Sequence, residues 1–366
     1  MNVVIAAGGT GGHVFPAVAL AEEFGRQDPS ASITVIGTGK TLEQTMLAGT
    51  PFHLEKIQVE GVIGQGVWSS IKGLALIPGA VWQAVRVLRA RCADLVIGTG
   101  GYTSPPVVIA AFLLGIRRAL LEPNAVPGMA NRVLGPLANK VFLSFEVAKQ
   151  FFNPSRTMTI GVPIRQDFFR EVPRAISDHV KTILVCGGSQ GAQAINTAMI
   201  ESLTVSPMLF KSLTVIHQTG MEDLARVQAA YQKAGIQATV VPFVEDMPRV
   251  LQSADLVLSR CGALTLAELA ACGKPAILIP YPFATHHHQE HNARVMEQAG
   301  AAIVILQQEL TGQRLAQEID QLVNDPPRVK RMAEKSLTLR RTDSAVVMVR
   351  ACLELVASGT SHGMKA

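Results

Sequence analysis

The stretch "GGTGGHVFPA", Gly8 to Ala17, places four glycines around one threonine and ends the glycine run at His13. An apolar run, Val3 to Ala7, precedes it, and apolar residues recur at helical spacing after it. Glycine loses much backbone entropy on folding, so this density indicates a turn that requires bare backbone. The pattern predicts a strand, a glycine turn and a helix, whose first N–H groups favour an anion or a polar ligand.

The same plan occurs twice along the chain. The stretches "ADLVIGTGGY", Ala93 to Tyr102, and "ADLVLSRCGA", Ala254 to Ala263, each predict a buried strand that ends in a glycine-bearing loop. Each follows an earlier strand with its own glycine turn, and the second of these is "TILVCGGSQGAQAIN", Thr182 to Asn196. The duplication predicts two tandem α/β domains, each a doubly wound parallel sheet. Ligands of such sheets bind outside the carboxyl ends of the strands, so we expect a site in a cleft between facing domains.

The domain boundary is expected near Thr157 to Phe169, where Gly161 and Pro163 interrupt the pattern. This divides the chain into an N-terminal domain of residues 1–162 and a C-terminal domain of residues 163–343. We expect the apolar last helix, about 344–358, to pack back onto the first domain.

Composition indicates a globular protein of 366 residues, with 48% apolar residues, 17% charged residues and a formal charge of +5. The excess of positive charge is too small to argue for nucleic acid as a partner. The five cysteines include no CxxC pair, which favours reduced, structural cysteines in a cytoplasmic protein. No apolar segment reaches the roughly 20 residues of a membrane-spanning helix. We therefore expect a protein that does not cross a membrane.

Short stretches suggest three nucleotide- or metal-binding motifs, and each of these motifs is incomplete. "GGTGGH" does not satisfy the dinucleotide pattern G-x-G-x-x-G, and "GTGKT", Gly37 to Thr41, has Thr34 where a phosphate-binding P-loop needs glycine. His287 and His291 would share one face of a helix, but the sequence offers no obvious third metal ligand. We therefore expect no metal and no nicotinamide cofactor.

Seven motifs remain, and they occur in a fixed order along nearly the whole chain. They are "GGTGGHVFPA", "IGTGGYTSPP", "LEPNAVPGMANR", "GVPIR", "CGGSQGAQAIN", "RCGALTLAELAACGKPAILIP" and "HHHQEHNA". Together they resemble the MurG family of peptidoglycan glycosyltransferases, within glycosyltransferase family 28. The resemblance implies the GT-B fold, with two Rossmann-like domains facing across a cleft.

The resemblance also implies a reaction. The family moves N-acetylglucosamine from UDP-N-acetylglucosamine to the C4 hydroxyl of the N-acetylmuramic acid of lipid I, an undecaprenyl-pyrophosphoryl-MurNAc-pentapeptide. The product is lipid II, and the anomeric carbon is inverted in one displacement. The implied location is peripheral, on the cytoplasmic face of the bacterial plasma (inner) membrane. The implied ligands are this donor, this acceptor and an anionic membrane surface, without a cofactor.

The second domain offers two glycine turns for the donor diphosphate. "GGSQG" carries Ser189 at one helix start, and "CGALTLAE" opens a second helix whose first turn, Ala263 to Thr265, has unsatisfied N–H donors. The resemblance implies that Glu268 binds the ribose hydroxyls and that the backbone at Val244 contacts uracil. The other donor-binding residues that it implies are Thr10, Gly11, Gly12, Asn124, Arg165, Leu264, Leu266, Ala267, Gln289 and Asn292.

His13 is the first candidate for the base that takes the acceptor's proton. It lies at a helix start, where the helix dipole disfavours the charged imidazole. The resemblance marks this histidine as important, and roles in proton transfer or in positioning remain open. Glu122 is a second candidate base, and Tyr102, Asn131 and Asn196 are expected to line the acceptor side of the cleft.

A membrane-facing patch is expected around "VWSSIKGLALIPGAVWQAVRVLRARCADL", Val67 to Leu95. Apolar and basic side chains alternate there in the manner of an anionic interface. The expected contact residues are Trp68, Ile71, Lys72, Leu74, Trp82, Arg86, Arg89 and Arg117. An ordinary core helix with a solvated basic edge explains the apolar residues equally well, and the family resemblance favours the membrane.

Two other functions remain compatible with the sequence. A GT-B enzyme with another lipid or small-molecule acceptor would share the motifs of the second domain. A nucleotide-sugar-binding protein without catalysis would be expected to lack His13 or Glu268, and both are present.

Overall fold

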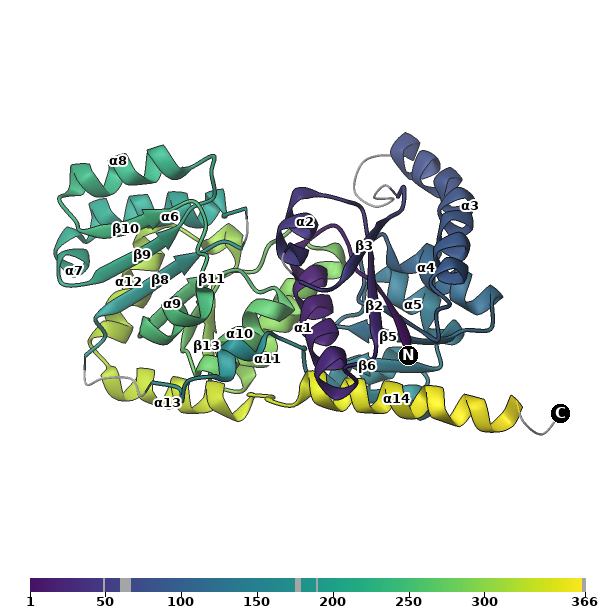
Figure 1. The fold of residues 1–366 in the computed structure, drawn as a ribbon. Coiled ribbons are helices and arrows are strands. Elements are labelled where there is room, and N and C mark those ends of the chain that lie inside the picture. Colours follow the sequence, from purple (N-terminus) through teal and green to yellow (C-terminus); the bar gives the residue numbers. More distant parts are fainter. Residues whose placement is uncertain (49, 60–66, 175–178, 189, 364–366) are drawn as a thin grey trace. The chain divides into compact units, whose positions relative to one another are not determined.

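The computed structural model describes residues 1–48, 50–59, 67–174, 179–188 and 190–363. The chain divides into two compact units. Unit 1 comprises Met1–Arg165 together with Asp343–Ala366, and unit 2 comprises Gln166–Thr342. Each unit is built on one parallel sheet with helices on both faces (Figure 1).

The sheet of unit 1 has seven strands in the order β3-β2-β1-β4-β5-β6-β7. All of its strand pairs are parallel. The order reverses between β1 and β4, and the loops after these two strands lie at this topological switch point. The strands are β1 (Asn2–Ala6), β2 (Ser32–Gly37), β3 (His53–Lys56), β4 (Leu95–Gly98), β5 (Arg117–Glu122), β6 (Lys140–Leu143) and β7 (Thr157–Thr159).

Helices cover both faces of this sheet and bury two apolar clusters. On one face α1 packs with the last helix, α14, where Met348, Val349 and Cys352 are buried against residues of α1 and β1. On the other face α3 and α4 pack together over the sheet. The helices are α1 (Gly11–Gln27), α2 (Thr41–Leu47), α3 (Val67–Ala90), α4 (Ser104–Leu113), α5 (Met129–Leu134) and α14 (Ser344–Gly363), with short 3-10 helices η1 (Gly135–Leu137), η2 (Glu146–Phe151) and η3 (Pro154–Arg156).

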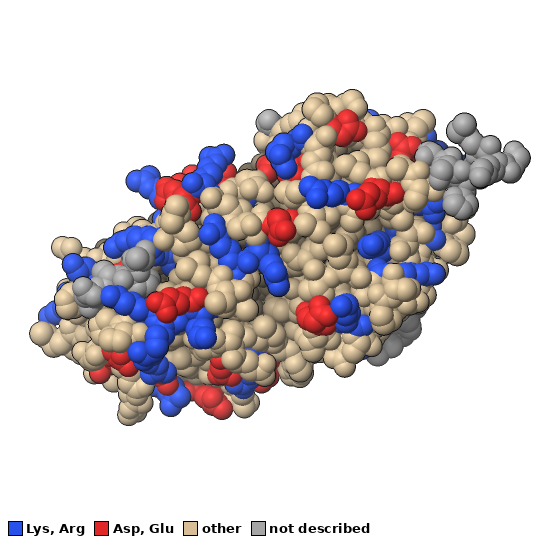
Figure 2. All heavy atoms as spheres, turned by 90° about the horizontal axis from the view of Figure 1, so that it is seen from below, with Lys and Arg blue, Asp and Glu red and all other residues tan. Residues whose placement is uncertain are grey.

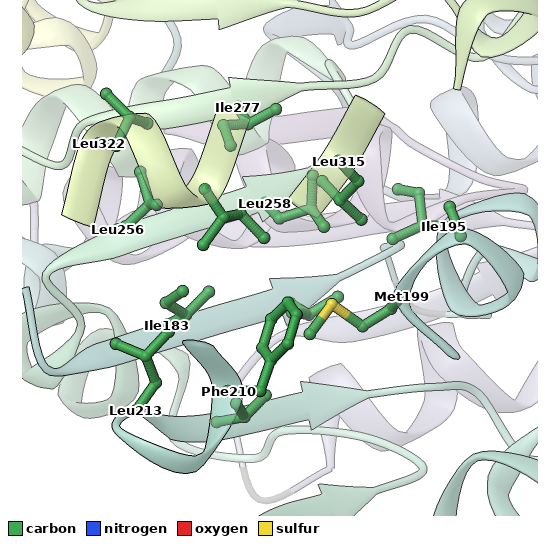
Figure 3. Close-up of a cluster of buried hydrophobic side chains, with 14 of the residues drawn as sticks. Ile183, Ile195, Met199, Phe210, Leu213, Leu256, Leu258, Ile277, Leu315 and Leu322 are labelled. Atoms are coloured by element: carbon green, nitrogen blue, oxygen red, sulfur yellow. The ribbon is translucent and has the colours of Figure 1, made fainter. Parts of the chain in front are cut away.

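The sheet of unit 2 has six parallel strands in the order β10-β9-β8-β11-β12-β13. They are β8 (Thr182–Cys186), β9 (Thr214–Gln218), β10 (Ala238–Val241), β11 (Leu256–Ser259), β12 (Ala276–Leu278) and β13 (Ala302–Val304). Figure 3 shows the core on one face, where Leu258 of β11 lies beside Leu315 of α12 and Leu256 lies beside Leu322 of the same helix. Met199 belongs to the same cluster.

The helices of unit 2 cover both faces of its sheet. They are α6 (Gln193–Val205), α7 (Pro207–Lys211), α8 (Leu224–Ala234), α9 (Met247–Ser253), α10 (Ala263–Cys272), α11 (His288–Gln298), α12 (Gly312–Val323) and α13 (Pro326–Thr338), with 3-10 helices η4 (Gln166–Phe169), η5 (Thr285–His287) and η6 (Gln307–Glu309). The predicted pair of doubly wound parallel sheets is confirmed. Among the described residues, no helix has both the length and the apolar character needed to cross a bilayer.

Candidate functional site

The first glycine turn lies at the carboxyl end of β1 and leads into α1, with Thr10 as the residue before the helix. His13 stands in the first turn of α1, and its Nδ1 lies 2.9 Å from the carbonyl oxygen of Thr99. A carbonyl oxygen can only accept, so Nδ1 carries the proton of the neutral ring. Nε2 is therefore the basic nitrogen of His13, which is the tautomer that proton transfer through Nε2 requires.

The ring of His13 packs on a second glycine turn, which follows β4. Gly100 has φ +100° and Gly101 has φ +73°, a backbone region that side-chain-bearing residues rarely adopt. A Cβ at Gly100 would lie 2.8 Å from Nδ1 of His13, and one at Gly101 would lie 2.6 Å from the carbonyl oxygen of Gly8. The two glycine turns and the imidazole therefore form one closely packed group. The exposed ring of Tyr102 borders this group beside Gly9.

Glu122 ends β5 and is only 1% exposed. Its Oε1 accepts from the backbone and side-chain nitrogens of Asn124 at 2.9 and 3.1 Å. Its Oε2 accepts from the backbone of Gly128 at 3.1 Å and from Nδ2 of Asn131 at 2.9 Å. Burial raises the pKa of Glu122 to about 7, although the four hydrogen bonds favour its ionised form. The carboxylate thus fixes the turn between β5 and α5, and the side chain of Asn131 is buried behind it.

In unit 2 a third glycine turn follows β8 and leads into α6. Gly191 (φ +76°) meets Gly220 (φ +79°) of the neighbouring loop, and a Cβ on either glycine would overlap backbone atoms of the other loop. Gln218 donates from Nε2 to the carbonyl oxygen of Gly188 at 2.7 Å. Ser189, predicted to contact the diphosphate, lies outside the described residues.

Asn196, expected at the cleft, is buried in a network behind this turn. Its Nδ2 donates to the Thr219 carbonyl oxygen at 3.0 Å and to Oδ2 of Asp223 at 2.8 Å. Its Oδ1 accepts from Nε2 of His217 at 3.0 Å, and Nδ1 of His217 accepts from the hydroxyl of Tyr231 at 3.1 Å. Burial lowers the pKa of His217 to about 4, which keeps the ring neutral. The amide of Asn196 therefore supports the loops on which the third turn rests.

A fourth glycine turn follows β11, and Gly262 caps the start of α10. Two side chains from α11 hold the residue before it: Oε1 of Gln289 accepts from the backbone N of Cys261 at 3.2 Å, and Nδ2 of Asn292 donates to its carbonyl oxygen at 3.3 Å. The first N–H groups of α10 have no acceptor within the helix. Of the predicted donor-binding residues on α10, Leu264, Thr265, Ala267 and Glu268 are partly exposed, whereas Ala263 and Leu266 are buried.

Arg260, which the sequence interpretation missed, precedes this turn and is largely buried. Its guanidinium donates to the carbonyl oxygens of Ile279 and Pro280, both at 3.2 Å, and to Oε1 of Gln307 at 2.7 Å. It also lies over the ring of Tyr281 at 5.4 Å, and burial lowers its pKa. Within the described part of the chain no carboxylate pairs with it. The side chain of Arg260 therefore joins the loop after β12 to the start of η6.

The remaining predicted contacts are spread over both units. Val244 is buried in the loop after β10. Arg165 ends unit 1, with its guanidinium 5.4 Å from the ring centre of Phe15. Thr10 and Gly12 are exposed at the start of α1, and Gly11 is buried.

The histidine-rich stretch does not form the helical pair considered from the sequence. His286 and His287 both have left-handed backbone conformations, with φ +52° and +50°, and α11 begins only at His288. His287 therefore precedes the helix that carries His291. Among the residues that the structure describes, no group of three His, Cys, Asp or Glu side chains is arranged to hold a metal ion.

The predicted membrane patch is described only in part, because the side chains of Trp68, Ile71, Lys72 and Leu74 lie outside the described residues. Trp82 on α3 is 60% exposed, with the guanidinium of Arg86 4.8 Å above its ring. At the end of the adjacent α4, the guanidinium of Arg118 lies 4.8 Å from the ring centre of exposed Phe112. Leu113, next to Phe112, is also exposed. Arg89 is exposed and Arg117 is half-buried.

Basic side chains also gather elsewhere on the surface. Figure 2 shows Lys and Arg collected over the end of unit 2 that carries α13, a helix with Arg328, Lys330, Arg331 and Lys335. Positive charge alone therefore does not single out the surface of α3 and α4. On α3 and α4 two exposed rings, Trp82 and Phe112, are each paired with an arginine. The same pairing occurs elsewhere, where Arg132 lies over exposed Phe151.

Comparison with known proteins assigns both units. The glycosyltransferase family 28 N-terminal domain matches residues 3–143, and the family 28 C-terminal domain matches residues 182–348. A protein of Syntrophus aciditrophicus (strain SB) is 41% identical over 358 residues, which cover 97% of this chain and 99% of that protein. A protein of Geobacter sulfurreducens is 42% identical over 362 residues, covering 98% and 99%. Both relatives are named UDP-N-acetylglucosamine–N-acetylmuramyl-(pentapeptide) pyrophosphoryl-undecaprenol N-acetylglucosamine transferase.

Among solved structures, MurG of Acinetobacter baumannii superposes with a TM-score of 0.76 at 29% identity, covering 96% of this chain and 99% of that one. The architecture is accordingly the GT-B fold that the sequence motifs imply. Since its family domains span both units and its relatives match it from end to end, the chain belongs to glycosyltransferase family 28 and, within it, to the MurG family.

Proposed function

We propose that the chain transfers N-acetylglucosamine from UDP-N-acetylglucosamine to the C4 hydroxyl of the N-acetylmuramic acid of lipid I, giving lipid II. The names of its near-full-length relatives support this substrate pair. The main structural support for the reaction is the contact between Nδ1 of His13 and the Thr99 carbonyl oxygen. Because Nδ1 donates in this contact, the basic lone pair of the neutral ring lies on Nε2.

His13 acts as the general base in this proposal. Nε2 takes the proton of the C4 hydroxyl as the hydroxyl oxygen attacks the anomeric carbon of the donor. The bond from that carbon to the diphosphate oxygen breaks, and its electron pair leaves with UDP. Attack from the face opposite UDP inverts the anomeric carbon. The Thr99 carbonyl oxygen stabilises the imidazolium through the proton on Nδ1.

The departing diphosphate is stabilised by the two helix starts of unit 2. The backbone N–H groups at the start of α6 and at Ala263, Leu264 and Thr265 donate to its oxygens, and the charge of Arg260 adds to them. This arrangement supplies positive potential without a metal ion. Gln289 and Asn292 contribute by holding Cys261 in place, Glu268 accepts from the ribose hydroxyls, and the backbone at Val244 reads uracil.

Unit 1 contacts the anionic cytoplasmic surface of the bacterial plasma membrane, where the lipid acceptor resides. The exposed rings of Trp82 and Phe112 enter the interface, and Arg86, Arg89 and Arg117 meet the lipid headgroups.

Vesicle sedimentation tests this surface. Each basic residue at an anionic interface contributes about 1 kcal/mol, so a variant with Arg86→Ala and Arg89→Ala should bind phosphatidylglycerol vesicles about 30-fold more weakly. The matched control removes two arginines of α13, Arg328→Ala and Arg331→Ala, and should bind as the wild type does. Equal losses in both variants would show that the attraction follows net charge and not this patch.

The transfer reaction itself is tested with purified protein, labelled UDP-N-acetylglucosamine and a short-chain lipid I analogue in detergent or vesicles. The label should appear in a disaccharide lipid with a β-linkage. Transfer to diacylglycerol or another acceptor, with none to the lipid I analogue, would favour the alternative of a GT-B enzyme with a different acceptor. Binding of the donor without transfer to any acceptor would refute the enzyme.

A further inference from the structure

The stretch "GTGKT", Gly37 to Thr41, has no role in the transfer reaction described above, although it resembles a phosphate-binding loop. In the structure its glycines surround an anion that belongs to the chain itself, the carboxylate of Glu43. Glu43 lies in the first turn of α2 and is only 2% exposed. Burying a carboxylate costs free energy unless its oxygens accept hydrogen bonds. The donors that bind Glu43 therefore show which segments of the chain it connects.

Three donors from two loops reach this carboxylate. Oε2 accepts from the backbone N of Gly39 at 2.6 Å, and Oε1 accepts from the hydroxyl of Thr38 at 2.8 Å. Oε1 also accepts from the backbone N of Gly9 at 3.0 Å, 34 residues earlier in the chain. The carboxylate therefore joins the loop after β2 to the first glycine turn.

The close fit of the carboxylate explains two of the glycines. A Cβ at Gly37 would overlap Oε2 of Glu43, and a Cβ at Gly8 would lie 3.2 Å from Oε1 and 2.8 Å from the side chain of Thr103. These turns lack side chains because the carboxylate occupies the space that a side chain would need.

The first glycine turn is thus held from two sides. Glu43 binds Gly9 on one side, and Gly101 lies against the Gly8 carbonyl oxygen on the other, next to the ring of His13. Gly9 has φ +98° and is followed at once by Thr10 and α1, so its orientation sets the direction in which α1 begins. A shift of this turn would move His13 relative to its acceptor, the Thr99 carbonyl oxygen.

We infer that Glu43 is a positioning residue of the transfer reaction: its carboxylate, bound by Gly39, Thr38 and Gly9, holds the first glycine turn so that His13 keeps its orientation. This inference rests on the proposed function, in which His13 takes the acceptor's proton. It assigns to the P-loop-like stretch the task of binding an internal carboxylate instead of a nucleotide phosphate.

The test compares Glu43→Gln with Glu23→Gln. Glu23 is an equally buried carboxylate of unit 1, 2% exposed, whose partners Arg26 and Gln27 lie on its own helix and away from the turn. Small misplacements of a reacting group lower turnover by about 10- to 100-fold, so kcat of Glu43→Gln should fall by that factor. The Kd for UDP should stay within about two-fold, because the proposed contacts to UDP lie in unit 2. Glu43→Asp, which keeps the carboxylate, should recover part of kcat. In Glu23→Gln, kcat should remain within about two-fold of the wild type.

Amide hydrogen exchange supplies a readout that does not depend on activity. The segment Gly8 to His13 should exchange faster in Glu43→Gln than in Glu23→Gln. If Glu43→Gln does not fold, Thr38→Val removes one of the three donors and should produce a smaller change in the same direction.

Equal kcat in Glu43→Gln and Glu23→Gln, or unchanged exchange of Gly8 to His13, would overturn the inference. A wild-type protein that transfers no sugar would instead refute the proposed function, and the exchange comparison would still decide the role of Glu43.

Discussion

Replacing Gly101 with alanine should lower both the stability and kcat of the protein, because the added Cβ has no room between the two glycine turns. A control glycine with a similar backbone conformation but open space shows how much of the loss comes from the left-handed conformation alone. At Gly101, φ is +73°, and a Cβ would lie 2.6 Å from the Gly8 carbonyl oxygen and 3.1 Å from Cδ2 of His13. Contacts below 3.0 Å are essentially never observed for a Cβ, so the two turns must separate by at least about 0.4 Å. The control is Gly115→Ala in the same unit, with φ +69° and no atom within 4 Å of its Cβ.

The left-handed conformation alone costs each variant about 1 to 2 kcal/mol. Overpacking against backbone adds about 1 to 3 kcal/mol at Gly101 only. Urea denaturation should therefore show a total loss of about 2 to 5 kcal/mol for Gly101→Ala and about 1 to 2 kcal/mol for Gly115→Ala. Because His13 moves with the turn, kcat should fall at least about 10-fold in Gly101→Ala and remain near wild type in the control. Equal stability and equal kcat in the two variants would refute the account of the packed glycine turns.

Three further predictions concern unit 2. The folded-state pKa of His217, about 4, lies below its ordinary value of 6.5, so the stability that is present above pH 6.5 is lost as pH falls toward 4. At pH 5 the loss should be about 2 kcal/mol relative to pH 7, measured by urea denaturation, and His217→Gln should lack it. Asn196→Ala leaves His217 and the Thr219 carbonyl oxygen without their partner and should lower the unfolding free energy by about 2 to 4 kcal/mol; a normal urea midpoint would contradict this. Arg260→Gln should weaken UDP binding about 10-fold in calorimetry and reduce its dependence on salt, and an unchanged Kd would show that this charge does not act on the diphosphate.

The sequence predicted the elements that local patterns encode. Glycine turns after short apolar runs placed the ends of β1, β4, β8 and β11, because close backbone approaches and left-handed conformations leave a clear signature in sequence. The repeated order of these turns was sufficient to predict two doubly wound sheets, and the seven motifs were sufficient to indicate the family.

The sequence did not predict which polar side chains are buried. Asn196 and Glu122 lie in glycine-rich or polar motifs, which are also typical of exposed ligand contacts. In the structure both side chains are instead buried and hydrogen-bonded within the protein. The sequence does not indicate the role of Glu43, because its hydrogen bond to Gly9 spans 34 residues and depends on the pairing of β1 with β2. Arg260 could have been found, since an arginine directly after a buried strand and before a glycine turn is unusual in an apolar context.

The role of His13 is tested most directly by measuring two quantities on the same His13→Asn protein: the rate of sugar transfer to the lipid I analogue in a single turnover, and the Kd for UDP-N-acetylglucosamine. If Nε2 of His13 takes the acceptor's proton, the transfer rate falls at least about 100-fold while the Kd stays within about two-fold of the wild type. A transfer rate close to that of the wild type, or loss of donor binding together with transfer, would contradict the assignment of His13 as the base.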